Sequence, residues 1–182
     1  LLDRPLSKWA DSHQSARWNT LGKAANAIPF VLAAGAGALW LGAGGEMASE
    51  TAWTSIKSAA LTVGLETLTK YAVGRSRPEE NLGAANFDPF GKKAPNSSFP
   101  SIHLGAAYAL VTPFAQKYDA GWLYPLAGIT AFGRIQQRQH FASDVVAGGL
   151  MGYAVGSLLH EQQRNRQVHV GPQSIQVGWS FK

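Results

Sequence analysis

Apolar residues recur at three- and four-residue spacing along most of the chain, and alternation typical of strands is almost missing before residue 167. The spacing predicts helices over residues 5–18, 26–41, 47–73, 101–117, 122–132 and 144–163. Residues 75–99 are rich in Gly, Pro, Asn and Ser and are expected to form one long irregular loop. The sequence therefore predicts an all-α fold, a single-domain bundle of about six helices.

The tail, residues 167–182, has a different pattern. Val168, Val170 and Val177 alternate with polar residues on either side of Gly171 and Pro172, which predicts a short hairpin or edge strand. We therefore expect a helical domain over residues 1–166 and a β-like C-terminal tail over residues 167–182.

One uncharged stretch, between Lys23 and Glu46, is long enough to cross a bilayer, which needs about 20 mostly apolar residues. It also contains Asn26, Pro29 and five glycines, and the other apolar runs are shorter than a span. The pattern therefore favours a buried helix bundle, with an integral membrane protein as the alternative.

Composition excludes several classes of protein. With 46% hydrophobic and 15% charged residues, the chain can build a core and is not a disordered protein. It has no cysteine, which excludes a disulfide scaffold, a thiolate nucleophile and metal sites held by thiolates. The net charge of +5 and the pI near 9.6 favour anionic partners such as phosphates, acidic membrane surfaces or nucleic acid. Because the chain begins with Leu1 rather than Met, any export signal is expected to lie upstream of it.

Candidate chemistry lies in three places, and the first is the end of the predicted helix 47–73. Lys70 and Arg77 are seven residues apart, about two helical turns, so their side chains can leave one face of that helix and converge on an anion. The alternative is a solvated basic helix end, which the helix dipole favours.

The second place is the start of the predicted helix 101–117, where Pro100, Ser101, Ile102 and His103 follow one another. Ser101 and the nearby backbone N–H groups would point outward from a helix N-terminus, which attracts anions, and His103 would lie in the first turn. The alternative is a helix cap beside a surface histidine.

The third place joins Arg134, His140 and Asp144. The carboxylate of Asp144 can accept a hydrogen bond from the His140 imidazole and fix its tautomer, which leaves the other ring nitrogen free to attack. The alternative is that Asp144 caps the following helix and His140 packs beside it. A metal site made of His103, His140 and Asp144 is disfavoured, because the nearby cationic side chains would repel a metal ion.

The order and spacing of these segments resemble the three signature segments of the type 2 phosphatidic acid phosphatase superfamily, which includes bacterial nonspecific acid phosphatases and vanadium haloperoxidases. Two positions depart from the family pattern. Gly133 stands where the third segment usually has serine, and Ile102 stands where the second usually has glycine. Because isoleucine is strained at positive φ, the turn at Ile102 must be helical or its N–H contact must differ.

The resemblance implies a role for each motif residue. His140 would attack phosphorus and form a phosphohistidine, with Asp144 orienting it, while His103 would protonate the leaving group and later activate water. The remaining motif residues would bind the phosphate oxygens; they are Lys70, Arg77, Ser101, Ile102 through the backbone of its turn, and Arg134. Arg75 is an additional candidate for phosphate contact.

The resulting hypothesis is a metal-independent phosphatase that needs no cofactor and acts on phosphomonoesters, among them lipid phosphates or isoprenoid pyrophosphates. The alternatives are a vanadate-dependent haloperoxidase and a non-catalytic module that binds phosphate headgroups. The resemblance also implies a phosphate-bearing small molecule or lipid as partner, peripheral membrane contact and no nucleic acid. It implies a periplasmic or membrane-associated location, with the site facing outside the cytoplasm.

Overall fold

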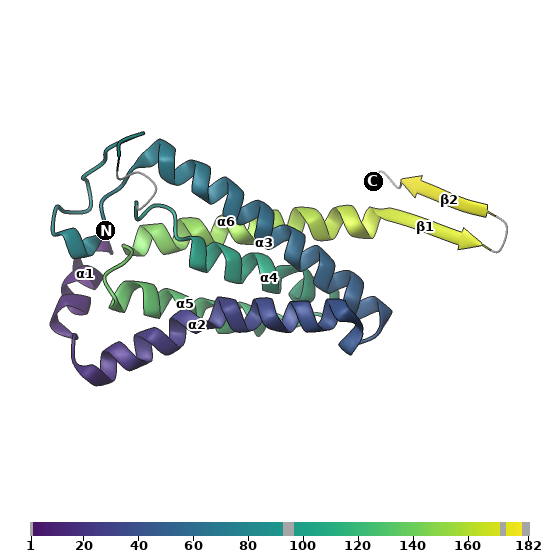
Figure 1. Ribbon diagram of the computed structural model, residues 1–182, viewed down its shortest axis with the longest axis horizontal. Coiled ribbons are helices and arrows are strands. Elements are labelled where there is room, and N and C mark those ends of the chain that lie inside the picture. The colour runs from purple at the N-terminus through teal and green to yellow at the C-terminus, as the bar shows by residue number, and fades with distance from the viewer. Residues whose placement is uncertain (1, 93–96, 172–173, 180–182) are drawn as a thin grey trace.

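The computed structural model describes residues 2–92, 97–171 and 174–179. In these residues the chain forms six α-helices, five of which lie along an elongated bundle while the N-terminal helix sits at one end (Figure 1). The predicted all-α fold is confirmed. The helices are α1 (Asp3–Ser12), α2 (Ala16–Ala38), α3 (Glu46–Val73), α4 (Ile102–Lys117), α5 (Leu123–Gln136) and α6 (Ala142–Asn165). A π-helical turn η1 (Leu39–Ala43) extends α2, and a 3-10 turn η2 (Pro78–Glu80) follows α3.

The tail forms the predicted hairpin. Strand β1 (Arg166–Gly171) pairs antiparallel with β2 (Ser174–Trp179), with Val168 opposite Val177. Pro172, which was expected in the turn, lies outside the described residues. The division of the chain into a domain and a tail at residue 166 stays a prediction.

The prediction of one helix over residues 5–18 is wrong, because the helical conformation is interrupted between α1 and α2. The hydroxyl of Ser12 donates to the carbonyl of Trp9 over 2.9 Å, and Nδ1 of His13 lies 2.8 Å from the same oxygen. Side chains that bond the terminal carbonyls in this way compete with the next turn of helix. Ser15 is then extended, with φ −74° and ψ 161°, and α2 begins at the following residue.

The predicted loop after α3 is tied to the end of the bundle by main-chain hydrogen bonds. Gly74 ends α3 in the left-handed conformation, with φ 61°, and a Cβ at this position would lie 1.9 Å from the carbonyl oxygen of Asp88. Only glycine fits both demands. Ser98 N then donates to Arg75 O over 2.7 Å, which brings the segment before α4 back to the end of α3.

Glycines on α6 bring its backbone against α4. A Cβ on Gly152 would lie 2.0 Å from the carbonyl oxygen of Gly105, and one on Gly148 would lie 2.4 Å from that of Ser101. Neither position has room for a side chain, so the two helices approach closely. This contact places the first turn of α4 beside the first turn of α6.

Helix α3 buries mostly polar side chains and exposes large apolar ones. The buried side of α3 consists largely of polar residues: Thr51, Thr54, Ser55, Ser58, Thr62, Glu66 and Lys70. Its outer side exposes large apolar residues: Leu61, Leu65 and Leu68. An exposed apolar surface of this extent marks contact with lipid or with another protein.

The expectation of a buried helix in the uncharged stretch is wrong. On α2 the small residues Ala25 and Ala36 face the bundle, while Phe30 and Val31 are 66% and 68% exposed. Helical spacing marks an apolar face, but apolar residues all round a helix do not show which side is covered. Among the described residues, two helical segments are long and apolar enough to cross a membrane, Ala16–Ala43 and Ala142–Asn165.

Candidate active site

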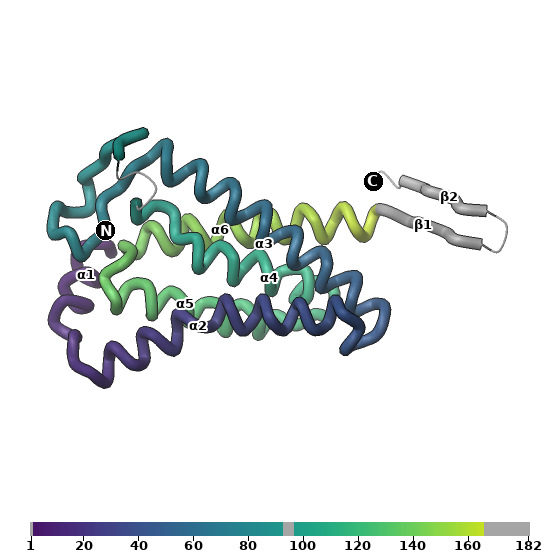
Figure 2. The backbone as a smooth tube through the Cα atoms, in the orientation of Figure 1, coloured from purple at the N-terminus to yellow at the C-terminus, as the bar shows by residue number. Residues whose placement is uncertain are grey.

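The three predicted segments meet at one end of the bundle. The C-terminal ends of α3 and α5 and the N-terminal ends of α4 and α6 all lie there (Figure 2). Hydrogen bonds of the main chain join them: Ser101 N donates to Asp144 O over 3.0 Å, and His140 N donates to Arg134 O over 3.2 Å. Segments far apart in the sequence therefore form one site.

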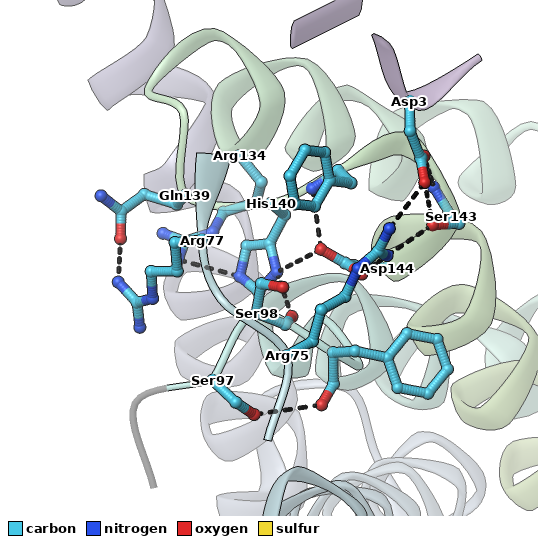
Figure 3. A network of polar contacts seen from close by, with 12 residues as sticks. Asp3, Arg75, Arg77, Ser97, Ser98, Arg134, Gln139, His140, Ser143 and Asp144 are labelled. Carbon is cyan, nitrogen blue, oxygen red and sulfur yellow. Dashed lines mark hydrogen bonds and ion pairs between the residues drawn. The ribbon is translucent and has the colours of Figure 1, made fainter. Parts of the chain in front are cut away.

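His140 is buried between the loop before α4 and the end of α5 (Figure 3). Its Nδ1 lies 2.6 Å from the carbonyl oxygen of Ser98, and because a carbonyl only accepts, Nδ1 carries the proton. Its Nε2 lies 3.2 Å from a guanidinium nitrogen of Arg134 and presents its lone pair there. Burial, together with the charges of Arg134, Lys70 and Arg77, holds the pKa of His140 well below its usual value. The imidazole is therefore neutral and able to act as a nucleophile.

The expected hydrogen bond between His140 and Asp144 is replaced by another arrangement. Nδ1 of His140 and Oδ2 of Asp144 are 3.8 Å apart, which is too long for a hydrogen bond. Oδ2 instead accepts from Phe141 N over 2.7 Å, and Oδ1 accepts from Arg75. The Ser98 carbonyl thus fixes the tautomer, while Asp144 caps α6 and acts on the imidazole through its nearby charge.

Cations crowd this end of the bundle. Lys70 is only 6% exposed, and its Nζ donates to Ser97 O over 2.5 Å. Burial, followed by the charge of Arg77, lowers the pKa of Lys70 to about 8. Arg134 is also nearly buried, and Arg77 bonds to the side chain of Gln139. Several positive charges held this close favour a bound anion between them.

Two buried donors in the site have no hydrogen-bond partner among the described residues: the hydroxyl of Ser101 and Nε of Arg134. Buried polar atoms are nearly always satisfied, so these two point to an acceptor that binds there. Ile102 is the first residue of α4, and the turn is therefore helical, as its β-branched side chain requires. Its backbone belongs to a helix N-terminus, which favours the same kind of ligand.

His103 lies in the first turn of α4, directly after Ile102, with its ring edge-on to that of Phe30 at a centroid distance of 5.8 Å. Burial, and then the charges of Arg134, Lys70 and Arg77, lowers the pKa of His103 to about 4. A bound phosphate dianion opposes those charges and raises the affinity of His103 for a proton. In the described part of the chain, His, Asp and Glu side chains form no group of three placed to hold a metal ion.

Arg75 is not positioned to bind phosphate. Its guanidinium bonds to Asp3, Ser143 and Asp144, so these donors are already engaged. The carbonyls of Ser97 and Ser98 were missed by the sequence analysis, because a main-chain carbonyl carries no residue signature. The polar side chain of Gln139, next to His140, and the carboxylate of Glu79, two residues after Arg77, were available signals of partners for Arg77.

Comparisons with known proteins bear on the family of the chain. The family model described as PAP2 superfamily matches residues 51–167, which include all three segments. The chain is 35% identical over 105 residues to the lipid A 1-phosphatase of Porphyromonas gingivalis, a match that covers 54% of this chain and 21% of that protein. The chain thus spans about a fifth of the length of that relative. No solved structure matches the chain significantly. Because this family model matches more than half of the chain, the chain belongs to the PAP2 superfamily, the type 2 phosphatidic acid phosphatases and their relatives.

Proposed function

We propose that this protein is a metal-independent phosphatase that hydrolyses lipid phosphates, or isoprenoid pyrophosphates, through a phosphohistidine. The observation that carries the proposal is the state of His140: it is buried, its Nδ1–H is held by the Ser98 carbonyl, and its Nε2 faces the Arg134 guanidinium. The P. gingivalis relative is named as a phosphatase of a lipid, which supports the same reaction class.

In the first step, Nε2 of His140 attacks phosphorus and an N–P bond forms. The bond from phosphorus to the leaving oxygen breaks, and its electron pair stays with that oxygen. Protonated His103 donates its proton to the same oxygen, so the lipid leaves as a neutral alcohol. His103 is neutral in the free site, where burial and then the charges of Arg134, Lys70 and Arg77 lower its pKa; it takes up its proton from solvent as the phosphate dianion binds and offsets those charges.

In the second step, His103 is neutral and accepts a proton from a water molecule. The water oxygen attacks phosphorus, the N–P bond breaks, and its electron pair returns to Nε2 of His140. Orthophosphate then leaves. The first step needs neutral His140 and protonated His103, and the second needs neutral His103. The low pKa of His140 keeps the nucleophile neutral, and the low pKa of His103 keeps that imidazole neutral once its proton has gone to the leaving group.

Phosphoryl transfer depends mainly on positioning and on fixed positive charge around the equatorial oxygens. Lys70, Arg77 and Arg134 supply that charge, and Ser101 adds a donor that has no partner among the described residues. Each preorganised donor of this kind contributes about 3 kcal/mol to stabilisation of the transition state.

A lipid substrate is supported by the surroundings of the site. We propose that α2 and α6 lie in a membrane, because both have the length and composition of a span and expose large apolar side chains. An apolar groove of about 280 Å³ runs between α2 and α4. Its lining starts on α2 at Val31, directly after Phe30, and on α4 at Leu110, about two turns beyond His103. A hydrocarbon chain attached to the phosphate fits this groove. The periplasmic side of the membrane stays a prediction.

A substrate panel tests the reaction class. Purified protein treated with EDTA is expected to release orthophosphate from phosphatidate, an isoprenoid pyrophosphate or para-nitrophenyl phosphate. Bromide oxidation on addition of vanadate and peroxide, without phosphate release, would instead favour the haloperoxidase. Binding of phosphatidate vesicles without any turnover would favour the headgroup module, and loss of activity with EDTA would contradict the metal-independent mechanism.

The groove can be tested separately with two matched glycines of α2. A Cβ on Gly35 or on Gly37 meets nothing within 4 Å, so both positions have room for a side chain to start, and of the two only Gly35 lines the groove. Gly35→Leu is expected to raise the KM for long-chain phosphatidate about tenfold and to leave para-nitrophenyl phosphate hydrolysis unchanged. Gly37→Leu is the control and is expected to match the wild type. Equal effects of both variants on phosphatidate would contradict a chain in the groove.

The charge of Lys70 predicts a pH dependence. Because the pKa of Lys70 is about 8, a rise in pH above that value removes one of the cations that bind phosphate. Lys70→Arg keeps its charge at every accessible pH. The ratio of kcat/KM between wild type and Lys70→Arg is therefore expected to be constant below pH 7 and to fall about tenfold per pH unit well above pH 8. A ratio that stays constant to pH 10 would show that Lys70 keeps its proton.

A further inference from the structure

The N-terminal helix reaches the candidate site through its first residue, Asp3 (Figure 3). Oδ1 of Asp3 accepts from Ser143 N over 2.8 Å, and Oδ2 accepts from the Ser143 hydroxyl over 2.7 Å. Oδ2 also pairs with a guanidinium nitrogen of Arg75 at 2.8 Å. One carboxylate therefore joins α1 to the first turn of α6 and to the segment that follows α3.

Arg75 lies between two carboxylates, those of Asp3 and Asp144. One terminal nitrogen of its guanidinium bonds to Asp3 and the other bonds to Asp144 and, over 2.7 Å, to the hydroxyl of Ser143. Its Nε donates to Ala84 O over 2.9 Å, and its Cζ lies 4.4 Å from the centre of the Phe141 ring. The guanidinium is thus fixed at both ends and on one face, so it holds the Asp144 carboxylate in one position.

The charges of Asp3, Arg75 and Asp144, together called the trio, determine the electrostatic potential at His140. Asp144 is fully buried and the Arg75 side chain is 7% exposed, so their interaction is weakly screened. Arg75 alone would neutralise Asp144. With Asp3 as a second carboxylate the trio carries one net negative charge, and Asp144 presents it 3.8 Å from the His140 ring. When Nε2 bonds to phosphorus, the imidazole becomes cationic, and this negative charge stabilises it.

We propose that Asp3 and Arg75 are positioning residues for the phosphoryl-transfer reaction: together they fix Asp144 and keep its negative charge available to the nucleophilic histidine. The proposal rests on the phosphohistidine mechanism proposed above. Burial tends to raise the pKa of Asp3, but the hydrogen bonds from Ser143 and Arg75 outweigh it and hold the pKa below its usual value. Asp3 is accordingly ionised at the pH of the reaction.

The first test is Asp3→Asn, which keeps the shape of the side chain and removes its charge. We expect kcat for para-nitrophenyl phosphate to fall about tenfold, with KM changed less than about twofold, because the cations that bind phosphate are untouched. Asp11→Asn is the matched control, since Asp11 lies on the same helix and pairs with Arg138 at 2.8 Å on the surface. Asp11→Asn is expected to keep the wild-type kcat. Asp3→Glu, which retains the charge, is expected to keep kcat within about threefold of the wild-type value.

The second test separates charge from simple attachment of α1. Ser143→Ala removes the hydroxyl that bonds to Asp3 and Arg75, and it leaves the ion pairs of Arg75 with both carboxylates in place. Its kcat is expected to stay within about threefold of the wild type, because the charges of the trio are unchanged. If Asp3 only attaches α1 to α6, Ser143→Ala slows the reaction as much as Asp3→Asn does, and the proposal is overturned. Wild-type kcat in Asp3→Asn overturns it as well.

Failure of this proposal is distinguishable from failure of the proposed function. If the wild-type protein releases phosphate and traps label on His140, but kcat is unchanged in Asp3→Asn, only the proposed role of Asp3 is contradicted. Wild-type protein without phosphate release removes the proposed function itself. Thermal unfolding of each variant, measured beside the kinetics, identifies the folded fraction to which each kcat refers.

Discussion

Replacing His140 by alanine is expected to abolish phosphate release, with a loss of about 10⁴-fold or more in kcat. The reason is the lack of any substitute nucleophile in the described site. His103 is engaged as the proton donor, Lys70 donates to Ser97 O, and Arg134 remains charged. Without Nε2, the cations still bind phosphate but nothing attacks it, so the KM for the residual activity is expected to change little.

The direct measurement is covalent trapping with a phosphate substrate labelled in the phosphoryl group. Acid lability with stability to alkali identifies phosphohistidine in the quenched wild-type protein, and His140→Ala is expected to retain no label. His160→Ala is the matched control, because His160 lies far along α6 from the site and is expected to leave labelling unchanged. Label that persists in His140→Ala would contradict the assignment of the nucleophile.

The bundle could be predicted from the sequence because helical periodicity is a local signal. The helix predicted over residues 47–73 differs from α3 (Glu46–Val73) by one residue at its start. The break at residues 13–15 was missed because it depends on bonds of Ser12 and His13 to one carbonyl, which spacing does not reveal. The exposure of α2 was missed for a related reason: a helix that is apolar on all sides gives no sign of which side faces the bundle.

The three segments that meet in the structure could be predicted from the sequence, but part of the hydrogen bonding between them could not. Position 140 was expected to face position 144 across one helical turn. The structure starts α6 at Ala142, so His140 lies in the preceding loop and the spacing rule for a helix does not apply to it. Its partner is a main-chain carbonyl, that of Ser98, and every residue type has one. The pairing of Arg75 with Asp3 spans 72 positions and depends wholly on how the helices pack.

In the proposed mechanism, the cations that bind phosphate also help to lower the proton affinity of the two histidines. Burial, and then the charges of Arg134, Lys70 and Arg77, lower the pKa values of His140 and His103, so both imidazoles are neutral in the free protein. Phosphate neutralises those cations when it binds. His103 then gains a proton more readily, while His140 keeps its Nδ1 proton on the Ser98 carbonyl and its Nε2 lone pair toward phosphorus. In the proposed mechanism, substrate binding therefore gives the two histidines their different roles.

That division of roles makes a prediction for His103→Ala that depends on the leaving group. An alkoxide from a lipid phosphate is strongly basic and needs a proton as it leaves, so hydrolysis of phosphatidate is expected to fall about 10²- to 10⁴-fold. The para-nitrophenolate ion is stable without a proton, so phosphorylation of His140 by para-nitrophenyl phosphate is expected to stay near the wild-type rate.

The second step still needs His103, because water must lose a proton as it attacks the phosphohistidine. His103→Ala is therefore expected to release one equivalent of para-nitrophenol per protein in a rapid burst and then to stall with the phosphoenzyme accumulated. Stopped-flow absorbance measures the burst, and quenching with labelled substrate measures the trapped intermediate. Equal losses for phosphatidate and para-nitrophenyl phosphate, without a burst, would mean that His103 positions the phosphate rather than transferring protons. The burst is thus the signature that separates proton transfer by His103 from binding by its cationic neighbours.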